Sequence, residues 1–67
     1  MRISELSAQT GVSTHRLRRY ESLGLISSDR QPNGYRNFSV ATVRSVIFID
    51  MSRKIGFTLD EIADFIP

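Results

Sequence analysis

Residues 13–20 concentrate side chains that can bind a polyanion. Three of these eight residues are arginines, and hydroxyl and imidazole groups lie beside them. Guanidinium groups form paired hydrogen bonds with phosphates and with guanine edges, and hydroxyl groups can bond to either. The combination predicts contact with the major groove of double-stranded DNA. The candidate contact residues in this stretch are Ser13, Thr14, His15, Arg16, Arg18, Arg19 and Tyr20.

A helix-turn-helix over about residues 3–22 must position these side chains. Ile3 and Leu6 share one face of a first short amphipathic segment. Gly11 can take the positive φ that ends a helix and starts a tight turn, and Val12 then enters the core. Two such segments joined at a glycine are typical of this motif.

The second segment is the candidate recognition helix. Ser13 can cap it, because a serine oxygen accepts hydrogen bonds from the N–H groups of a first helical turn. Leu17 and Tyr20, three residues apart, face inward. We therefore expect Arg16 and Arg18 to lie on the free face and to reach base edges or phosphates.

Residues 27–38 predict a small two-stranded wing. Asn33-Gly34 favours a hairpin turn, because both residue types tolerate positive φ. After the turn, Arg36 and Phe38 are expected on one side of a strand and Tyr35 on the other. Arginines on both sides of the turn predict contact with a DNA backbone. The candidate contact residues in the wing are Arg30, Gly34, Tyr35 and Arg36.

Two further helices are predicted, over about residues 40–55 and 58–66. Ser39 is expected as the N-cap of the first, whose core stripe at helical spacing is Val43, Val46, Ile47, Met51 and Ile55. Phe48 and Ile49 widen this stripe, so they either pack against neighbouring helices or are covered by a partner subunit. The second helix begins with a Thr58–Glu61 capping box. Its predicted inner face is Leu59, Ile62, Ala63 and Ile66.

Charge is distributed unevenly along the 67 residues, whose net charge is +2. Residues 13–36 hold five arginines against two acids, whereas residues 57–67 hold three acids and no base. This asymmetry predicts one basic face for nucleic acid. The acidic residues at the end are read as a solvated face, namely Asp60, Glu61 and Asp64.

Composition argues against enzymes, metal sites and membrane spans. The chain has no cysteine, so disulfides and thiolate metal sites are excluded. It has no glycine-rich phosphate loop, its one histidine is His15, and its length is too small to enclose a pocket. No stretch approaches the roughly 20 apolar residues of a membrane helix. We expect a single cytoplasmic domain, residues 1–67, with no catalytic residue, cofactor or metal.

Several motifs together resemble the MerR family of transcription regulators. They are Thr10-Gly11-Val12-Ser13, Leu17-Arg18-Arg19-Tyr20-Glu21, Gly24-Leu25, Gly34-Tyr35-Arg36 and Ile55-Gly56-Phe57-Thr58-Leu59-Asp60-Glu61-Ile62. The resemblance covers nearly the whole chain and implies a mainly α, winged helix-turn-helix fold with about four helices and a two-stranded wing. It also implies that Arg53 and Lys54 approach phosphate, although both equally suit the negative end of a helix dipole.

The same resemblance implies a regulator that distorts promoter DNA for RNA polymerase. Such regulators pair two subunits through a long helix after this domain, so we expect these 67 residues to be largely monomeric and homodimers to need that helix. Two alternatives stay open. One is an excisionase-like factor that bends DNA, and the other is a protein-interaction module that uses the surface at Phe48 and Ile49.

Overall fold

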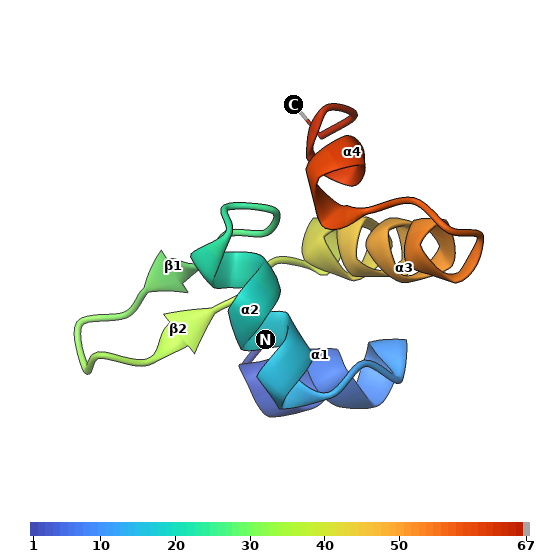
Figure 1. The fold of residues 1–67 in the computed structure, drawn as a ribbon. Helices are drawn as coiled ribbons and strands as arrows, with labels where there is room; N and C mark the ends of the chain where they lie inside the picture. The colour runs from blue at the N-terminus through green and yellow to red at the C-terminus, as the bar shows by residue number, and fades with distance from the viewer. Residues whose placement is uncertain (67) are drawn as a thin grey trace.

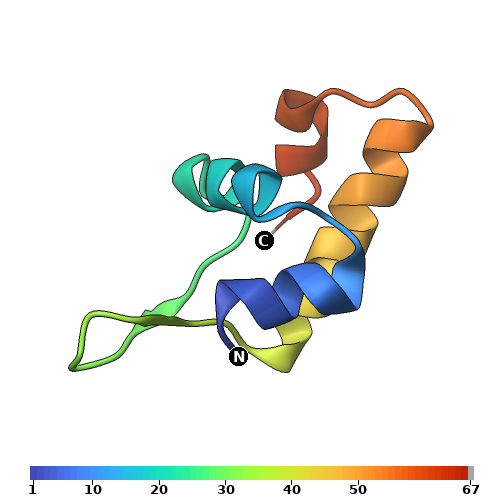
Figure 2. The same ribbon diagram turned by 90° about the horizontal axis from the view of Figure 1, so that it is seen from below.

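The computed structural model describes residues 1–66, and Pro67, where we predicted a helix stop or a linker, lies outside the described residues. Within them, four helices and one antiparallel sheet form in the order α1 (Ile3–Thr10), α2 (Thr14–Ser22), β1 (Asp29–Arg30), β2 (Arg36–Asn37), α3 (Val40–Lys54) and α4 (Leu59–Ala63). The predicted fold class, mainly α with a small two-stranded wing, is confirmed. The wing extends away from the helices in both views (Figures 1 and 2).

The turn between α1 and α2 is held by short polar contacts. Gly11 has φ 74° and donates its N–H to the Ser7 carbonyl at 2.9 Å. The Ser7 hydroxyl donates to the carbonyl of Val12 at 2.7 Å, and Val12 is buried. Ser13 then caps α2 by accepting from the Arg16 N–H at 3.2 Å. The glycine and the cap therefore act as predicted and fix the direction of α2.

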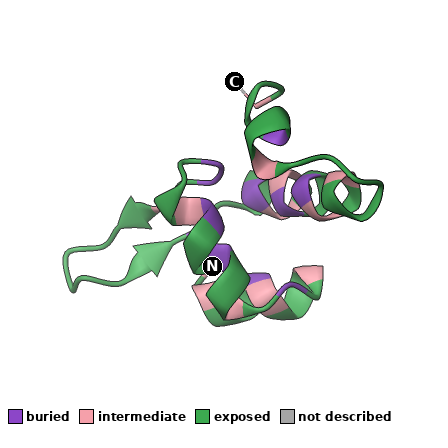
Figure 3. Cartoon of the chain, viewed as in Figure 1, coloured by how far each residue is buried: buried purple, intermediate pink, exposed green. Residues whose placement is uncertain are grey.

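One hydrophobic core joins all four helices and the base of the wing. Its buried residues are Leu6, Val12, Leu17, Tyr20, Leu25, Ile26, Phe38, Val46, Ile49 and Ile62. The wing strands themselves are exposed, whereas the inner sides of α2 and α3 are buried (Figure 3). Phe38, directly after β2, is 1% exposed. This side chain therefore ties the wing to the core.

The predicted hairpin turn at Asn33-Gly34 forms. Gly34 has φ 86°, whereas no non-glycine residue among residues 1–66 has positive φ, so Asn33 does not use the left-handed conformation that it tolerates. Gln31 accepts from the Gly34 N–H at 2.9 Å and donates to the Tyr35 carbonyl at 2.7 Å. The loop therefore has three residues, with one left-handed glycine at its end. Pro32 favours this form because its fixed negative φ suits the first position of a type I turn.

The buried face of α3 is rotated from the predicted stripe. The helix buries Thr42, Val46 and Ile49. Three members of the predicted stripe are instead exposed, namely Ile47, Met51 and Ile55. Phe48 and Ile49, which were predicted to share one environment, differ in burial. Ile49 is fully buried, whereas Phe48 is 46% exposed. Apolar residues surround this helix, so spacing alone did not identify the inner face.

The caps of α3 and α4 differ. Ser39 occupies the N-cap of α3 but makes no side-chain capping bond; its hydroxyl lies 3.2 Å from the Thr42 hydroxyl instead. The α4 capping box is complete. Glu61 donates its N–H to the Thr58 hydroxyl at 3.1 Å, and its carboxylate accepts from the Thr58 N–H at 3.0 Å. The predicted box at Thr58 and Glu61 is therefore confirmed.

The fourth helix is shorter than the predicted 58–66. It ends at Ala63, and the following N–H groups of Phe65 and Ile66 bond to carbonyls three residues back, at 3.0 and 3.2 Å. Such bonds tighten the chain into a narrower turn. Ile62 is buried as predicted, but Ala63 is exposed. The inner face of α4 is therefore narrower than the sequence indicated.

Candidate nucleic-acid interface

The outer face of α2 carries positive charge that has no internal partner. Leu17 and Tyr20 turn inward and are buried, while His15, Arg18 and Arg19 are exposed. Among residues 1–66, neither Arg18 nor Arg19 forms an ion pair. Their guanidinium groups are therefore available to an external anion.

The wing is fixed beside α2 by an ion pair. Arg36, which pairs with Arg30 across the two strands, places Nη1 2.9 Å from the Glu21 carboxylate of α2. The other oxygen of Glu21 accepts from the Ser28 hydroxyl. Glu21 thus holds β2 against the end of α2. Arg30 makes no ion pair within residues 1–66.

The start of the chain also supports the wing. The guanidinium carbon of Arg2 lies 4.0 Å from the ring centroid of Tyr35, a cation–π distance. The Met1 ammonium donates to Asn37 Oδ1 at 2.8 Å and to the Phe38 carbonyl at 2.6 Å. Arg2 therefore adds a positive charge at the wing that residue spacing did not predict.

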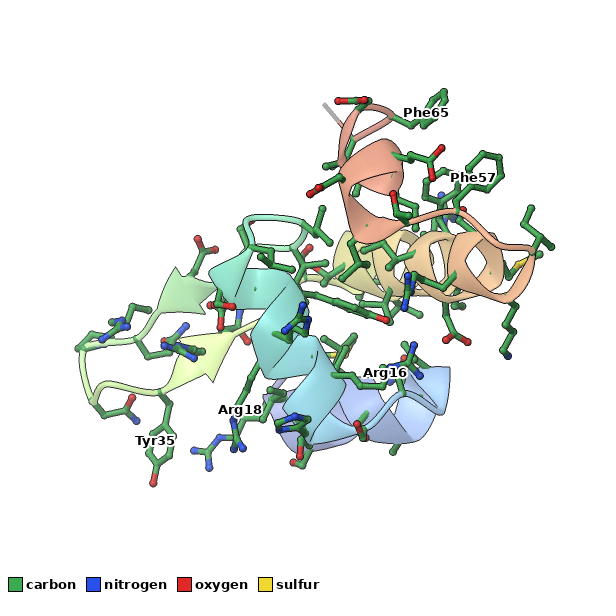
Figure 4. All side chains as sticks on the ribbon, viewed as in Figure 1. Arg16, Arg18, Tyr35, Phe57 and Phe65 are labelled. Atoms are coloured by element: carbon green, nitrogen blue, oxygen red, sulfur yellow. The ribbon has the colours of Figure 1, made fainter. Side chains whose placement is uncertain are left out.

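Arg16 is exposed, but its side chain is directed toward α3. Its Nη2 donates to the Tyr20 hydroxyl at 2.7 Å and to Asp50 Oδ1 of α3 at 2.9 Å. Residues two apart on a helix point in nearly opposite directions, so Arg16 and Arg18 lie at opposite edges of the exposed surface of α2. Figure 4 shows Arg18 and Tyr35 toward one side of the molecule and Arg16 on the α3 side of α2. The bond to Asp50 is the main cause that raises the pKa of Arg16.

Asp50 joins two cations at the end of α3. Its Oδ1 accepts from Arg16, and its Oδ2 lies 3.1 Å from Lys54 Nζ. Both contacts lower the pKa of Asp50, and the hydrogen bond from Arg16 has the larger effect. Arg53 and Lys54 lie in the last turn of α3, as predicted, where their positive charges interact favourably with the negative end of the helix dipole. Both side chains are exposed, and a phosphate contact by either stays a prediction.

The remaining candidates occupy three kinds of position. Ser13 is used as the cap of α2, and Thr14 is half-buried at its first residue. Gly34 lies in the exposed wing turn. Tyr20 is only 2% exposed, and its hydroxyl is bonded to Arg16. The structure therefore places Tyr20 in the core, as its spacing predicted, where it supports Arg16 and has little surface for DNA.

An apolar groove lies between α3 and α4, away from α2 and the wing. It is lined by Phe48, Ser52, Ile55, Phe57, Ile62 and Phe65. Phe57 and Ile62, which flank the capping box, both line it. Figure 4 shows Phe57 and Phe65 on this end of the molecule. Among residues 1–66, no helix is both long enough and apolar enough to cross a membrane.

Acid should destabilise the domain through Asp50 and Glu61. The pKa of Glu61 is lowered by hydrogen bonds from the Thr58 backbone and then from its side chain, and that of Asp50 by its cations. A carboxylate whose pKa is lowered in the folded state stabilises the fold fully at pH values above its ordinary pKa, roughly 4. This stabilisation is lost as the pH falls through the pKa of the folded state.

We expect the urea midpoint to fall between pH 6 and pH 3, and to fall less in the double variant Asp50→Asn, Glu61→Gln. The comparison with the unmodified chain isolates these two groups from the other carboxylates. An equal fall in both proteins would contradict this account.

A helix-turn-helix with an attached β hairpin defines this chain as a winged helix-turn-helix domain. Residues 1–67 match the family described as MerR HTH family regulatory protein, and the chain belongs to that family. The resemblance seen in the motifs is thus confirmed.

Individual relatives and a solved structure support the same family assignment. The chain is 45% identical over 62 residues to the mercuric resistance operon regulatory protein of Bacillus cereus, covering 91% of this chain and 47% of that protein. It is 38% identical over 61 residues to the transcriptional regulator HmrR of Rhizobium leguminosarum bv. viciae, covering 91% and 47%. A crystal structure of a MerR family transcriptional regulator from Listeria monocytogenes superimposes with a TM-score of 0.90 at 31% identity, covering 98% and 51%. The chain thus spans about half the length of these relatives.

Proposed function

We propose that this domain binds double-stranded DNA sequence-specifically, with α2 in the major groove and the wing on the adjacent backbone. The observation that carries the proposal is the exposed face of α2, where Arg18 and Arg19 have no internal ion pair, beside a wing that adds Arg30. A helix of this size fits the major groove, and arginine is the side chain that most often reads guanine there. The names of the relatives, which are transcriptional regulators, support the same assignment.

The contacts divide into two kinds. His15, Arg16, Arg18 and Arg19 of α2 are proposed to face base edges or nearby phosphates, with Ser13 and Thr14 at the helix start. Backbone contacts are assigned to the wing and to the end of α3. These residues are Arg30, Gly34, Tyr35, Arg36, Arg53 and Lys54.

The whole regulator is proposed to act on transcription. The chain spans about half the length of the matched relatives, so the roles beyond DNA binding are proposed for a longer protein. We propose that the full protein is a cytoplasmic homodimer that distorts a promoter for RNA polymerase, and that this domain contributes binding rather than catalysis. Family membership does not favour the excisionase-like alternative.

Selection from a pool of random duplexes tests the proposal. The 67-residue chain should enrich one short sequence, and the binding constant for it should fall as salt rises, because bound phosphates release counterions. The enriched sequence also provides the duplex for all further measurements. Recovery of random sequences after several rounds, or binding that is independent of salt, would contradict the proposal.

Arg36→Ala should weaken all duplexes by a similar factor. Arg36 lies in the wing, where Glu21 holds it at 2.9 Å, so its removal should loosen the wing, delete a proposed backbone contact and lower the salt slope by about one unit. Titrations of the selected and a scrambled duplex at several salt concentrations measure both quantities. Arg44→Ala is the matched control, since Arg44 is exposed on α3 and forms no ion pair among residues 1–66. A loss confined to the selected duplex would show that Arg36 reads sequence instead.

A further inference from the structure

A four-residue polar cluster joins the first turn of α2 to α3. Arg16 donates from the same nitrogen, Nη2, to Tyr20 at 2.7 Å and to Asp50 at 2.9 Å, and Asp50 also holds Lys54 at 3.1 Å. The Arg16 side chain is 44% exposed, and that of Asp50 is 16% exposed. Arg16 lies on the side of α2 that faces α3 (Figure 4). The cluster thus forms one edge of the recognition helix.

We propose that Asp50 is a specificity-determining residue of the DNA interface, because it holds Arg16 in one orientation at the edge of the recognition helix. Asp50 does not itself touch DNA in this proposal; it is a positioning residue for Arg16. Arg16 is the third residue of α2, and the N-terminal residues of a recognition helix are those that reach base edges. The inference rests on the proposed function of the same surface.

The first argument concerns orientation. An arginine free to rotate can bond to any phosphate within reach, and fixing it on binding costs conformational entropy. In this structure two hydrogen bonds and the Tyr20 ring, 5.7 Å from the guanidinium carbon, already restrict Arg16. A guanidinium carries five N–H donors, so those on Nε and Nη1 remain for an acceptor. A fixed set of donors favours duplexes that place acceptors in one position.

The second argument concerns charge. The Asp50 carboxylate lies between Arg16 and Lys54 and offsets one of their two positive charges. Affinity for any duplex, whatever its sequence, rises with the number of cations at the interface. Asp50 therefore lowers non-specific binding while it preserves the specific contact of Arg16. Both effects increase the ratio of specific to non-specific affinity.

Asp50→Asn tests the inference directly. The dissociation constants of the 67-residue chain are measured for the selected duplex and for a scrambled duplex of equal length. We expect tighter binding to the scrambled duplex and a fall in the ratio by about fivefold or more, the low end of what one base contact contributes. Asp64→Asn is the matched control, because it removes the same charge from an exposed residue that forms no ion pair within residues 1–66. This control should leave the ratio unchanged.

A double-mutant cycle separates positioning from a general structural effect. In an Arg16→Ala background, Asp50→Asn should change the ratio much less, because the positioning effect passes through Arg16 and only the charge effect on Lys54 remains. Arg16→Lys provides a second variant that keeps the charge but loses the planar guanidinium, and it should also lower the ratio. An unchanged ratio in Asp50→Asn, or an equal fall without Arg16, would overturn the inference.

The outcomes also separate this inference from the proposed function. If the unmodified chain selects no sequence, both fail together. If it selects a sequence and Asp50→Asn discriminates as well as the unmodified chain, only the role of Asp50 fails.

Discussion

Phe38→Ala is expected to leave most of the domain unfolded at room temperature. The Phe38 side chain is 1% exposed, so its loss opens the core at the base of the wing. Truncating a buried phenylalanine costs about 3–5 kcal/mol, and a core of this size rarely supplies more than that. Far-UV circular dichroism with urea titration measures the change.

Tyr35→Ala is the matched control for this prediction. Tyr35 belongs to the same hairpin but is 53% exposed, so its removal should change the urea midpoint little. A Phe38→Ala protein that unfolds at the midpoint of the unmodified chain would mean that the wing is not anchored in the core.

Arg18→Ala should cause the largest loss of binding among single substitutions on α2. Arg18 is exposed, forms no ion pair within residues 1–66 and lies on the wing side of α2. Removing a bidentate base contact costs about 1–3 kcal/mol and relaxes discrimination at one base position. Fluorescence anisotropy with the selected duplex and its single-base variants measures both effects.

The same titrations distinguish other roles for Arg18. Arg44→Ala again controls for the loss of one charge outside α2 and the wing. An equal loss on every duplex would make Arg18 a phosphate contact. Unchanged binding at low salt would show that α2 is not the recognition helix.

Features that depend on near neighbours in the sequence were predicted well. Gly11 ends α1, Ser13 caps α2, and Thr58 forms the capping box with Glu61. Each feature depends on backbone groups within about four residues, so residue type and spacing suffice to identify it.

Features that depend on tertiary packing were predicted less well. The inner face of α3 was misassigned because Ile47 and Ile55 satisfy helical spacing as well as Ile49, which the rest of the fold buries. The length of the hairpin loop was not predicted, because several hairpin loops accept an Asn-Gly pair.

At the candidate site, too, local features were predicted and long-range contacts were not. Residue types and their place on α2 and the wing predicted a basic surface, but they did not predict which arginines are already paired. Asp50, which holds Arg16, lies 34 residues further along the chain. Glu21 and Arg2, which contact Arg36 and Tyr35, carried no local signal for these contacts.

Amide chemical-shift mapping with the selected duplex tests the central claim most directly. A ¹⁵N-labelled chain is titrated with the duplex, and the shifted amides are located on the fold. The account predicts the largest shifts in α2 and in the wing around residues 29–37, with small shifts in α4. Shifts concentrated at the groove of Phe48, Phe57 and Phe65, with α2 unchanged, would contradict it.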